Sequence, residues 1–165
     1  MQLRHIILKL ILFLSAYYLS LTFVVASLDK IIDPLTFSKL IFNYEITPYW
    51  INNLVALILP WLELICGLIL FFGIFFNNNT SKNNKNIFFQ YEEAANNIII
   101  LMLIWFIFIL TIATVRGLDI DCGCGLSETK TLPIIRLKED IYLLILSFII
   151  KFRFKIINFF KINTI

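Results

Sequence analysis

The sequence predicts an all-α integral membrane protein: a four-helix bundle with a short interfacial helix after the first span. Its 165 residues are 60% hydrophobic, whereas soluble domains are about 45–50% apolar. The mean hydropathy of +0.89 is equally high. Because one spanning helix needs about 20 apolar residues, this length accommodates about four spans with short loops. The composition therefore excludes a large soluble domain, and we expect a single membrane domain, 1–165.

The first span is expected at residues 6–27, IILKLILFLSAYYLSLTFVVAS, directly after Arg4 and His5. A charged start and small residues at the end of the run also fit a cleaved secretory signal. The apolar core of a signal has about 7–15 residues, however, and this run is longer. We therefore predict that the segment is retained as a membrane helix, with cleavage as the alternative.

Residues 28–53 are too polar to span a bilayer. Charged residues and prolines are mixed there with aromatic side chains such as Phe37, Tyr44 and Trp50. Trp and Tyr rings favour the headgroup region of a membrane. We therefore expect a short amphipathic helix lying at the membrane surface.

Three further apolar runs complete the predicted bundle. The second span is expected at 54–76, the third at 97–115 and the fourth at 140–157. Between the second and third, residues 77–96 begin with NNNTSKNNKN, which has no apolar side chain to bury and predicts a solvated loop. Residues 116–139 connect the third span to the fourth.

The distribution of Lys and Arg sets the expected orientation. With four spans, both termini and the 77–96 loop lie on one side, which then holds eight of the 14 Lys and Arg residues. The positive-inside rule places that side in the cytoplasm of a bacterial-type inner membrane, so the loops 28–53 and 116–139 face outward. Since the basic residues border apolar runs rather than forming a patch on a soluble surface, lipid is the expected partner and nucleic acid is not.

The outward loop contains RGLDIDCGCG, with Cys122 and Cys124 separated by one glycine. Three of the five glycines of the chain lie in this stretch: Gly117, Gly123 and Gly125. A disulfide across one residue closes a small ring whose backbone must distort, and glycine adopts such angles most readily. Strained disulfides are easily reduced, and thiols outside the cytoplasm can form disulfides. The pattern predicts a redox-active pair.

Two other interpretations of the cysteines stay open. A closed zinc site needs four ligands, and the only histidine, His5, is expected at the opposite membrane face, so no metal is expected. A permanent structural clip is the stronger alternative, although so short a loop constrains little of the unfolded chain. Asp119 and Asp121 disfavour a thiolate whereas Arg116 favours one, which leaves the reactivity of the pair undecided.

Glu63 lies within the second span, where an ionisable side chain is costly and therefore a functional candidate. Pro60, Cys66 and Gly67 stand three or four residues away, so the four residues share one helix face. We expect Glu63 to point into the bundle as a candidate proton carrier. A structural acid paired with Tyr, Ser or Arg116 is an equal alternative. Cys66 is expected to serve helix packing, because a free cysteine behaves as a small hydrophobe.

Three segments of the chain together resemble the MauE/DoxX family of small four-helix membrane proteins. The segments are ASLDKIIDPLTF after the first span, LPWLELICGLIL in the second and RGLDIDCGCG after the third. The residues that match the family pattern are Ala26, Ser27, Asp29, Lys30, Pro60, Glu63, Gly67, Arg116, Gly117, Cys122, Gly123 and Cys124. The resemblance implies a role in redox or disulfide maturation of an exported protein, with methylamine utilisation as the namesake pathway.

The function expected from these observations is thiol–disulfide exchange through Cys122 and Cys124. The expected partner is a thioredoxin-like or exported protein, with a membrane quinone as a candidate electron acceptor and Glu63 as proton carrier. No haem, flavin or dinucleotide motif is present in the sequence. A non-enzymatic assembly factor or subunit of a redox complex, in which the cysteines form a clip, is the alternative. A small transporter, motivated by Glu63 alone, is the third and weaker one.

Overall fold

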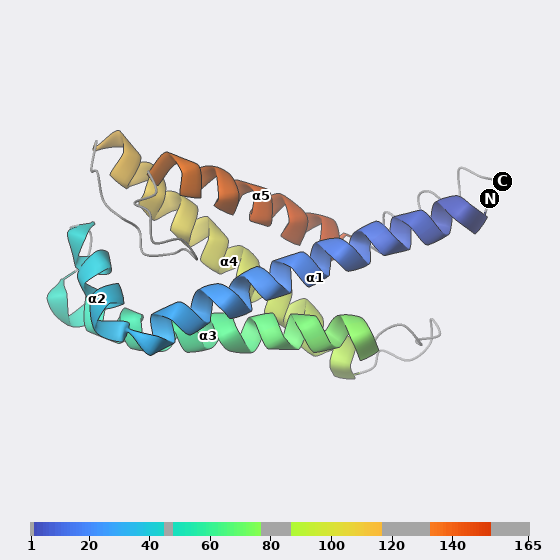
Figure 1. Ribbon diagram of the computed structural model, residues 1–165, viewed down its shortest axis with the longest axis horizontal. Coiled ribbons are helices and arrows are strands. Elements are labelled where there is room, and N and C mark those ends of the chain that lie inside the picture. The colour runs from blue at the N-terminus through green and yellow to red at the C-terminus, as the bar shows by residue number, and fades with distance from the viewer. Residues whose placement is uncertain (1, 45–47, 77–86, 117–132, 153–165) are drawn as a thin grey trace.

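The computed structural model describes residues 2–44, 48–76, 87–116 and 133–152, which form five α-helices and no strand (Figure 1). The helices are α1 (Gln2–Ile32), α2 (Pro34–Asn43), α3 (Tyr49–Phe76), α4 (Ile87–Val115) and α5 (Pro133–Lys151). The all-helical class predicted from the sequence is confirmed for this part of the chain.

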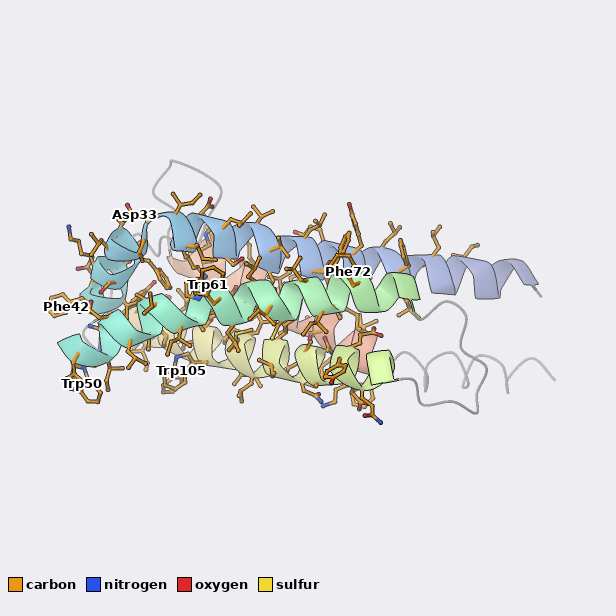
Figure 2. The ribbon with its side chains drawn as sticks, turned by 90° about the horizontal axis from the view of Figure 1, so that it is seen from below. Asp33, Phe42, Trp50, Trp61, Phe72 and Trp105 are labelled. Carbon is orange, nitrogen blue, oxygen red and sulfur yellow. The ribbon has the colours of Figure 1, made fainter. Side chains whose placement is uncertain are left out.

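Three of these helices are long and apolar enough to cross a membrane. The candidate spans are Leu10–Ile32, Trp50–Gly73 and Gln90–Val115. Large apolar side chains also cover the outside of the helices, and Trp50, Trp61 and Phe72 are each more than half exposed (Figure 2). Since outward-facing apolar surface on this scale is stable in lipid rather than in water, the chain is a multi-pass membrane protein.

The fourth predicted span is not among these candidates. The apolar part of α5 within the described residues is 141–150, which at about 1.5 Å per residue covers about half of a hydrocarbon core about 30 Å thick. The first half of α5 carries Arg136, Lys138, Glu139 and Asp140 instead. A complete four-helix membrane bundle therefore stays a prediction.

The helices are arranged as two packed pairs. α1 runs along α3 and α4 runs along α5, while α2 lies across the end where α1 finishes and α3 starts (Figure 1). All four long helices contribute to the core, which contains Leu19, Phe23, Cys66, Leu70, Ile99, Leu103, Leu143 and Ile150. The core therefore holds both pairs together, and Cys66 is part of it, as expected from the sequence.

The helices begin earlier than the predicted spans and α1 ends later. α3 begins at Tyr49 and α4 at Ile87, so residues 87–96 of the expected loop are helical. Residues 87–96 contain neither Gly nor Pro, and adding a residue to an existing helix costs less than starting a new one, so the helix can extend beyond the apolar run. α1 ends at Ile32, which places Lys30 in its last turn rather than in a loop.

The predicted short helix after the first span is α2. Asp33 caps it, since its carboxylate accepts hydrogen bonds from the Thr36 amide at 3.1 Å and the Thr36 hydroxyl at 2.6 Å. Pro34 follows at the first helical position, where its missing N–H costs nothing. The Ser38 hydroxyl donates to the Asn53 side chain at 2.6 Å and so ties α2 to α3.

Candidate functional site

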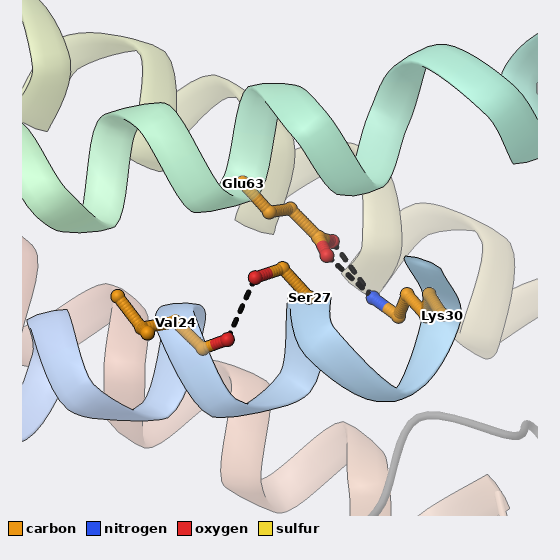
Figure 3. Close-up of polar contacts among 4 residues, drawn as sticks. All are labelled: Val24, Ser27, Lys30 and Glu63. Carbon is orange, nitrogen blue, oxygen red and sulfur yellow. Dashed lines mark hydrogen bonds and ion pairs between the residues drawn. The ribbon is translucent and has the colours of Figure 1, made fainter. Parts of the chain in front are cut away.

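A buried ion pair joins α1 to α3. The Lys30 ammonium lies 2.8 Å from both carboxylate oxygens of Glu63, and the two side chains are 4% and 2% exposed (Figure 3). Both residues were candidate site residues in the sequence, but their pairing was not predicted. The structural alternative for Glu63 named Tyr, Ser or Arg116 as its partner, and the structure provides Lys30 instead.

Helical periodicity directs both side chains inward. Along α3, Pro60, Glu63, Cys66 and Gly67 are all buried, which is the single face predicted from their spacing. Along α1, Lys30 follows Ser27 at a spacing of three, and both are buried on the side that contacts α3.

Gly67 allows the two helices to come close beside the pair. A methyl group on Gly67 would lie 3.0 Å from Val24 Cγ2, 3.2 Å from the Ser20 carbonyl oxygen and 3.3 Å from Phe23 Cβ. These distances are tighter than ordinary van der Waals contact, so a side chain at this position would require Val24, Ser20 or Phe23 to shift. Because the approach lies about one helical turn beyond Glu63 along α3, it helps to bring Lys30 within reach of the carboxylate.

Two aromatic rings flank the ammonium group. Lys30 Nζ lies 5.2 Å from the centre of the Phe37 ring and 5.4 Å from the centre of the Phe106 ring. Aromatic faces attract cations at these distances. The rings and the Glu63 carboxylate therefore surround the lysine where it is removed from water. The neighbouring Ser27 hydroxyl donates a hydrogen bond to the Val24 carbonyl at 2.7 Å (Figure 3).

The ion pair lines a cavity of about 450 Å³ to which all five helices contribute. Most of its wall is apolar, with aromatic side chains from four helices: Tyr18, Phe23, Phe37, Tyr44, Trp105, Phe106 and Tyr142. Ligand sites are mostly apolar cavities of about 300–1,000 Å³ with a few polar groups, so this one has the size and composition of a small-molecule site.

Three further charged side chains of the wall come from the start of α5. Arg136, Glu139 and Asp140 line the cavity there, and Arg136 bonds to Glu139 at 2.8 Å. α4 ends and α5 begins at the same end of the bundle as α2 (Figure 1). The connection between residues 116 and 133 therefore starts and finishes at the end of the molecule where the ion pair lies.

Among the predicted site residues that the structure describes, Asp29 and Arg116 are not part of the buried pair. Asp29 is exposed one residue before Lys30, and Arg116 is exposed at the end of α4. Gly117, Cys122, Gly123 and Cys124 lie outside the described residues. In the described part of the chain, no three His, Cys, Asp or Glu residues are grouped to hold a metal ion.

A second buried polar contact joins α4 to α5 and was not predicted. The Asn96 amide donates to the Ser147 carbonyl at 3.1 Å, and the Ser147 hydroxyl donates to the Asn96 side-chain oxygen at 2.9 Å. Asn96 is 3% exposed and Ser147 is fully buried. Neither residue lines the cavity, so this pair connects helices without contributing to the candidate site.

The chain was compared with known protein families, curated proteins and solved structures. The family model described as "Methylamine utilisation protein MauE" matches residues 8–78, which include the ion pair and Gly67 but not Cys122 and Cys124. No curated protein and no solved structure matches significantly. The match confirms the resemblance predicted from the sequence for the first two of its three segments.

Proposed function

We propose that this MauE-like multi-pass membrane protein supports the redox maturation of an exported protein by thiol–disulfide exchange through Cys122 and Cys124. The family match supports a membrane protein associated with methylamine utilisation. In the proposed topology both termini are in the cytoplasm and the cysteines face outward from an inner membrane. The partner is then a thioredoxin-like or exported protein outside the cytoplasm.

The proposed exchange consists of two coupled steps, in which electrons and protons are conserved. Two thiols of the exported protein are oxidised to a disulfide while the Cys122–Cys124 disulfide is reduced to two thiols. The pair is then reoxidised to its disulfide, and its two electrons and two protons reduce a membrane quinone to a quinol. The attacking species in the first step is a thiolate of the partner.

The observation that carries this proposal is the buried Lys30–Glu63 pair at the end of the bundle where the 117–132 connection is attached. The Glu63 carboxylate and the Lys30 ammonium are in direct contact and line the same cavity. Buried ionisable groups in membrane spans mark proton relays and substrate sites. In the proposed reaction Glu63 carries protons between the thiols and the acceptor.

Alkylation of the protein in intact membranes tests this proposal. A maleimide that adds mass should label Cys122 and Cys124 only after mild reductant, and the exported partner should accumulate with free thiols in the Cys122→Ser/Cys124→Ser variant. Cys66→Ser is the matched control, because Cys66 is buried in the core. If the paired cysteines resist mild reductant, or their loss leaves partner oxidation unchanged, the redox function is wrong.

A non-enzymatic assembly factor is the second candidate. It is favoured by the range of the family match, which contains Lys30 and Glu63 but ends before the cysteines. In that case the ion pair is structural and the disulfide is a clip. The assembly function predicts that the partner copurifies with the Cys122→Ser/Cys124→Ser variant and matures normally.

A further inference from the structure

We propose that the 450 Å³ cavity binds the ring of a lipid-soluble quinone, the electron acceptor in the proposed function on which this inference rests. Three properties of the cavity support a quinone as its ligand: the aromatic side chains in its wall, the charges in its wall and its access from the lipid.

The walls favour a flat apolar ring. Phe37 and Phe106 both lie against the Lys30 ammonium and both line the cavity, with Tyr44 and Trp105 completing an aromatic surface. Aromatic rings stack in offset or edge-to-face arrangements, so a planar ring gains more in such a cavity than a branched chain of equal volume. The volume is also in the range of about 300–1,000 Å³ that is usual for small-molecule sites.

The charges of the wall favour an uncharged ligand with oxygen acceptors. The ionisable residues that line the cavity are Lys30, Arg136, Glu63, Glu139 and Asp140, two basic and three acidic. An anionic headgroup or a fatty acid would meet a net negative wall in a medium of low dielectric constant, where like charges repel strongly. The Lys30 ammonium can donate only to an acceptor, and a quinone carbonyl is a neutral acceptor.

Access is available from the lipid side. Tyr18, Trp105 and Tyr142 line the cavity and are also exposed on the outer surface. The rings of Tyr18 and Tyr142 meet edge to face, 6.2 Å apart, between α1 and α5. A ligand dissolved in the membrane can therefore reach the cavity without passing through water. Glu63, which lines the same cavity, is then placed to pass protons released by the two thiols to the quinone oxygens.

Photolabelling of the full chain in lipid nanodiscs tests the inference. An azido-ubiquinone with a short alkyl tail should crosslink to cavity residues such as Phe106 and Tyr142, as mapped by peptide mass spectrometry, and unlabelled quinone should compete. Ala26→Phe and Val55→Phe, which fill the cavity from α1 and α3, should each weaken labelling about tenfold, equivalent to about 1.4 kcal/mol of binding. Ala94→Phe is the matched control, because Ala94 is exposed and does not line the cavity.

The outcomes separate this inference from the function on which it rests. Label spread over lipid-facing residues without competition, or unchanged labelling in both cavity-filling variants while they retain wild-type stability, would overturn the quinone site. Thiol exchange that persists in such variants without saturable labelling rejects the site and leaves the cysteine function standing. Saturable labelling of the cavity in the Cys122→Ser/Cys124→Ser variant, together with normal partner maturation, supports the site and rejects the cysteine function.

Discussion

Two buried polar contacts between helices in the described part of the chain differ in chemistry and in surroundings. Asn96 and Ser147 join α4 to α5 with two neutral hydrogen bonds, each residue acting as donor and acceptor to the other. Lys30 and Glu63 join α1 to α3 with full charges at 2.8 Å. The neutral pair lies in packed side chains away from the cavity, whereas the charged pair forms part of the cavity wall.

This difference separates a structural contact from a functional candidate. Two reciprocal hydrogen bonds satisfy their own polar atoms and specify how two helices align. A buried ion pair loses much of its Coulombic gain to desolvation, and apolar residues of similar volume often stabilise a protein as well or better. Helix association alone does not require the charges, so their position on a cavity wall makes the two residues candidates for a chemical role.

Removing one charge should give the largest effect. Glu63→Gln leaves the Lys30 ammonium buried without its counterion, and such changes cost about 3–5 kcal/mol. SDS-induced unfolding in mixed micelles, followed by circular dichroism, measures the loss. The double variant Lys30→Met/Glu63→Leu should recover most of the stability while partner oxidation stays lost. If the double variant oxidises the partner protein normally, the ion pair is a structural contact without a role in the reaction.

Separating α1 from α3 should have the next largest effect. Gly67→Ala places a methyl group 3.0 Å from Val24 Cγ2 and 3.2 Å from the Ser20 carbonyl oxygen. Overpacking of this kind costs about 1–3 kcal/mol, of which the higher helix propensity of alanine offsets about 1 kcal/mol. The same unfolding assay should show this loss, and Ala94→Val, an exposed change on α4, should show little. Equal stability of Gly67→Ala and wild type would mean that close packing of α1 on α3 does not position the ion pair.

Removing the neutral Asn96–Ser147 contact should have a smaller effect, and it should lower only the free energy of unfolding. Asn96→Ala removes both hydrogen bonds to Ser147, and interhelical hydrogen bonds in membrane proteins contribute about 0.6 kcal/mol on average, with a maximum of about 1.7. Unfolding of Asn96→Ala, Ser147→Ala and the double variant gives the coupling energy. Partner oxidation should remain at the wild-type rate. A loss of oxidation without a loss of stability would contradict the division between the two contacts.

The sequence was sufficient to predict the buried face of α3, since Pro60, Glu63, Cys66 and Gly67 follow the period of a helix that packs on one side. It was also sufficient for the helical class and for a short helix after the first span. These features depend on local periodicity and composition, which a single sequence contains.

The contacts between helices were not predictable in the same way. Lys30 stands where basic residues usually mark the end of a span, and we assigned it to a loop. The regular spacing of Ser27 and Lys30 along the buried face of α1 was the signal that could have corrected this assignment. Phe106 and Ser147 find their partners only through the packing of distant helices, which no pattern in one segment specifies.

The exposed contact between Asp33 and Thr36 should contribute least to stability, so it serves as a reference for the two buried contacts. Hydrogen bonds from the Thr36 hydroxyl and then from the Thr36 amide hold the pKa of the Asp33 carboxyl below its ordinary value of 3.8. The folded chain thus binds this proton less readily than the unfolded chain. The stabilisation of the α2 N-terminus is therefore complete above pH 3.8 and is lost as the pH falls through the lowered pKa.

The amide resonance of Thr36, followed by NMR in micelles as the pH falls, reports this titration directly. Its midpoint should lie below 3.8 in the wild type. Asp33→Asn should keep the cap and abolish the titration, because an amide side chain accepts the same hydrogen bonds without ionising. A midpoint at or above 3.8 would mean that the carboxylate does not cap α2. Because Asp33 is exposed, Asp33→Asn and the wild type should unfold with nearly the same free energy.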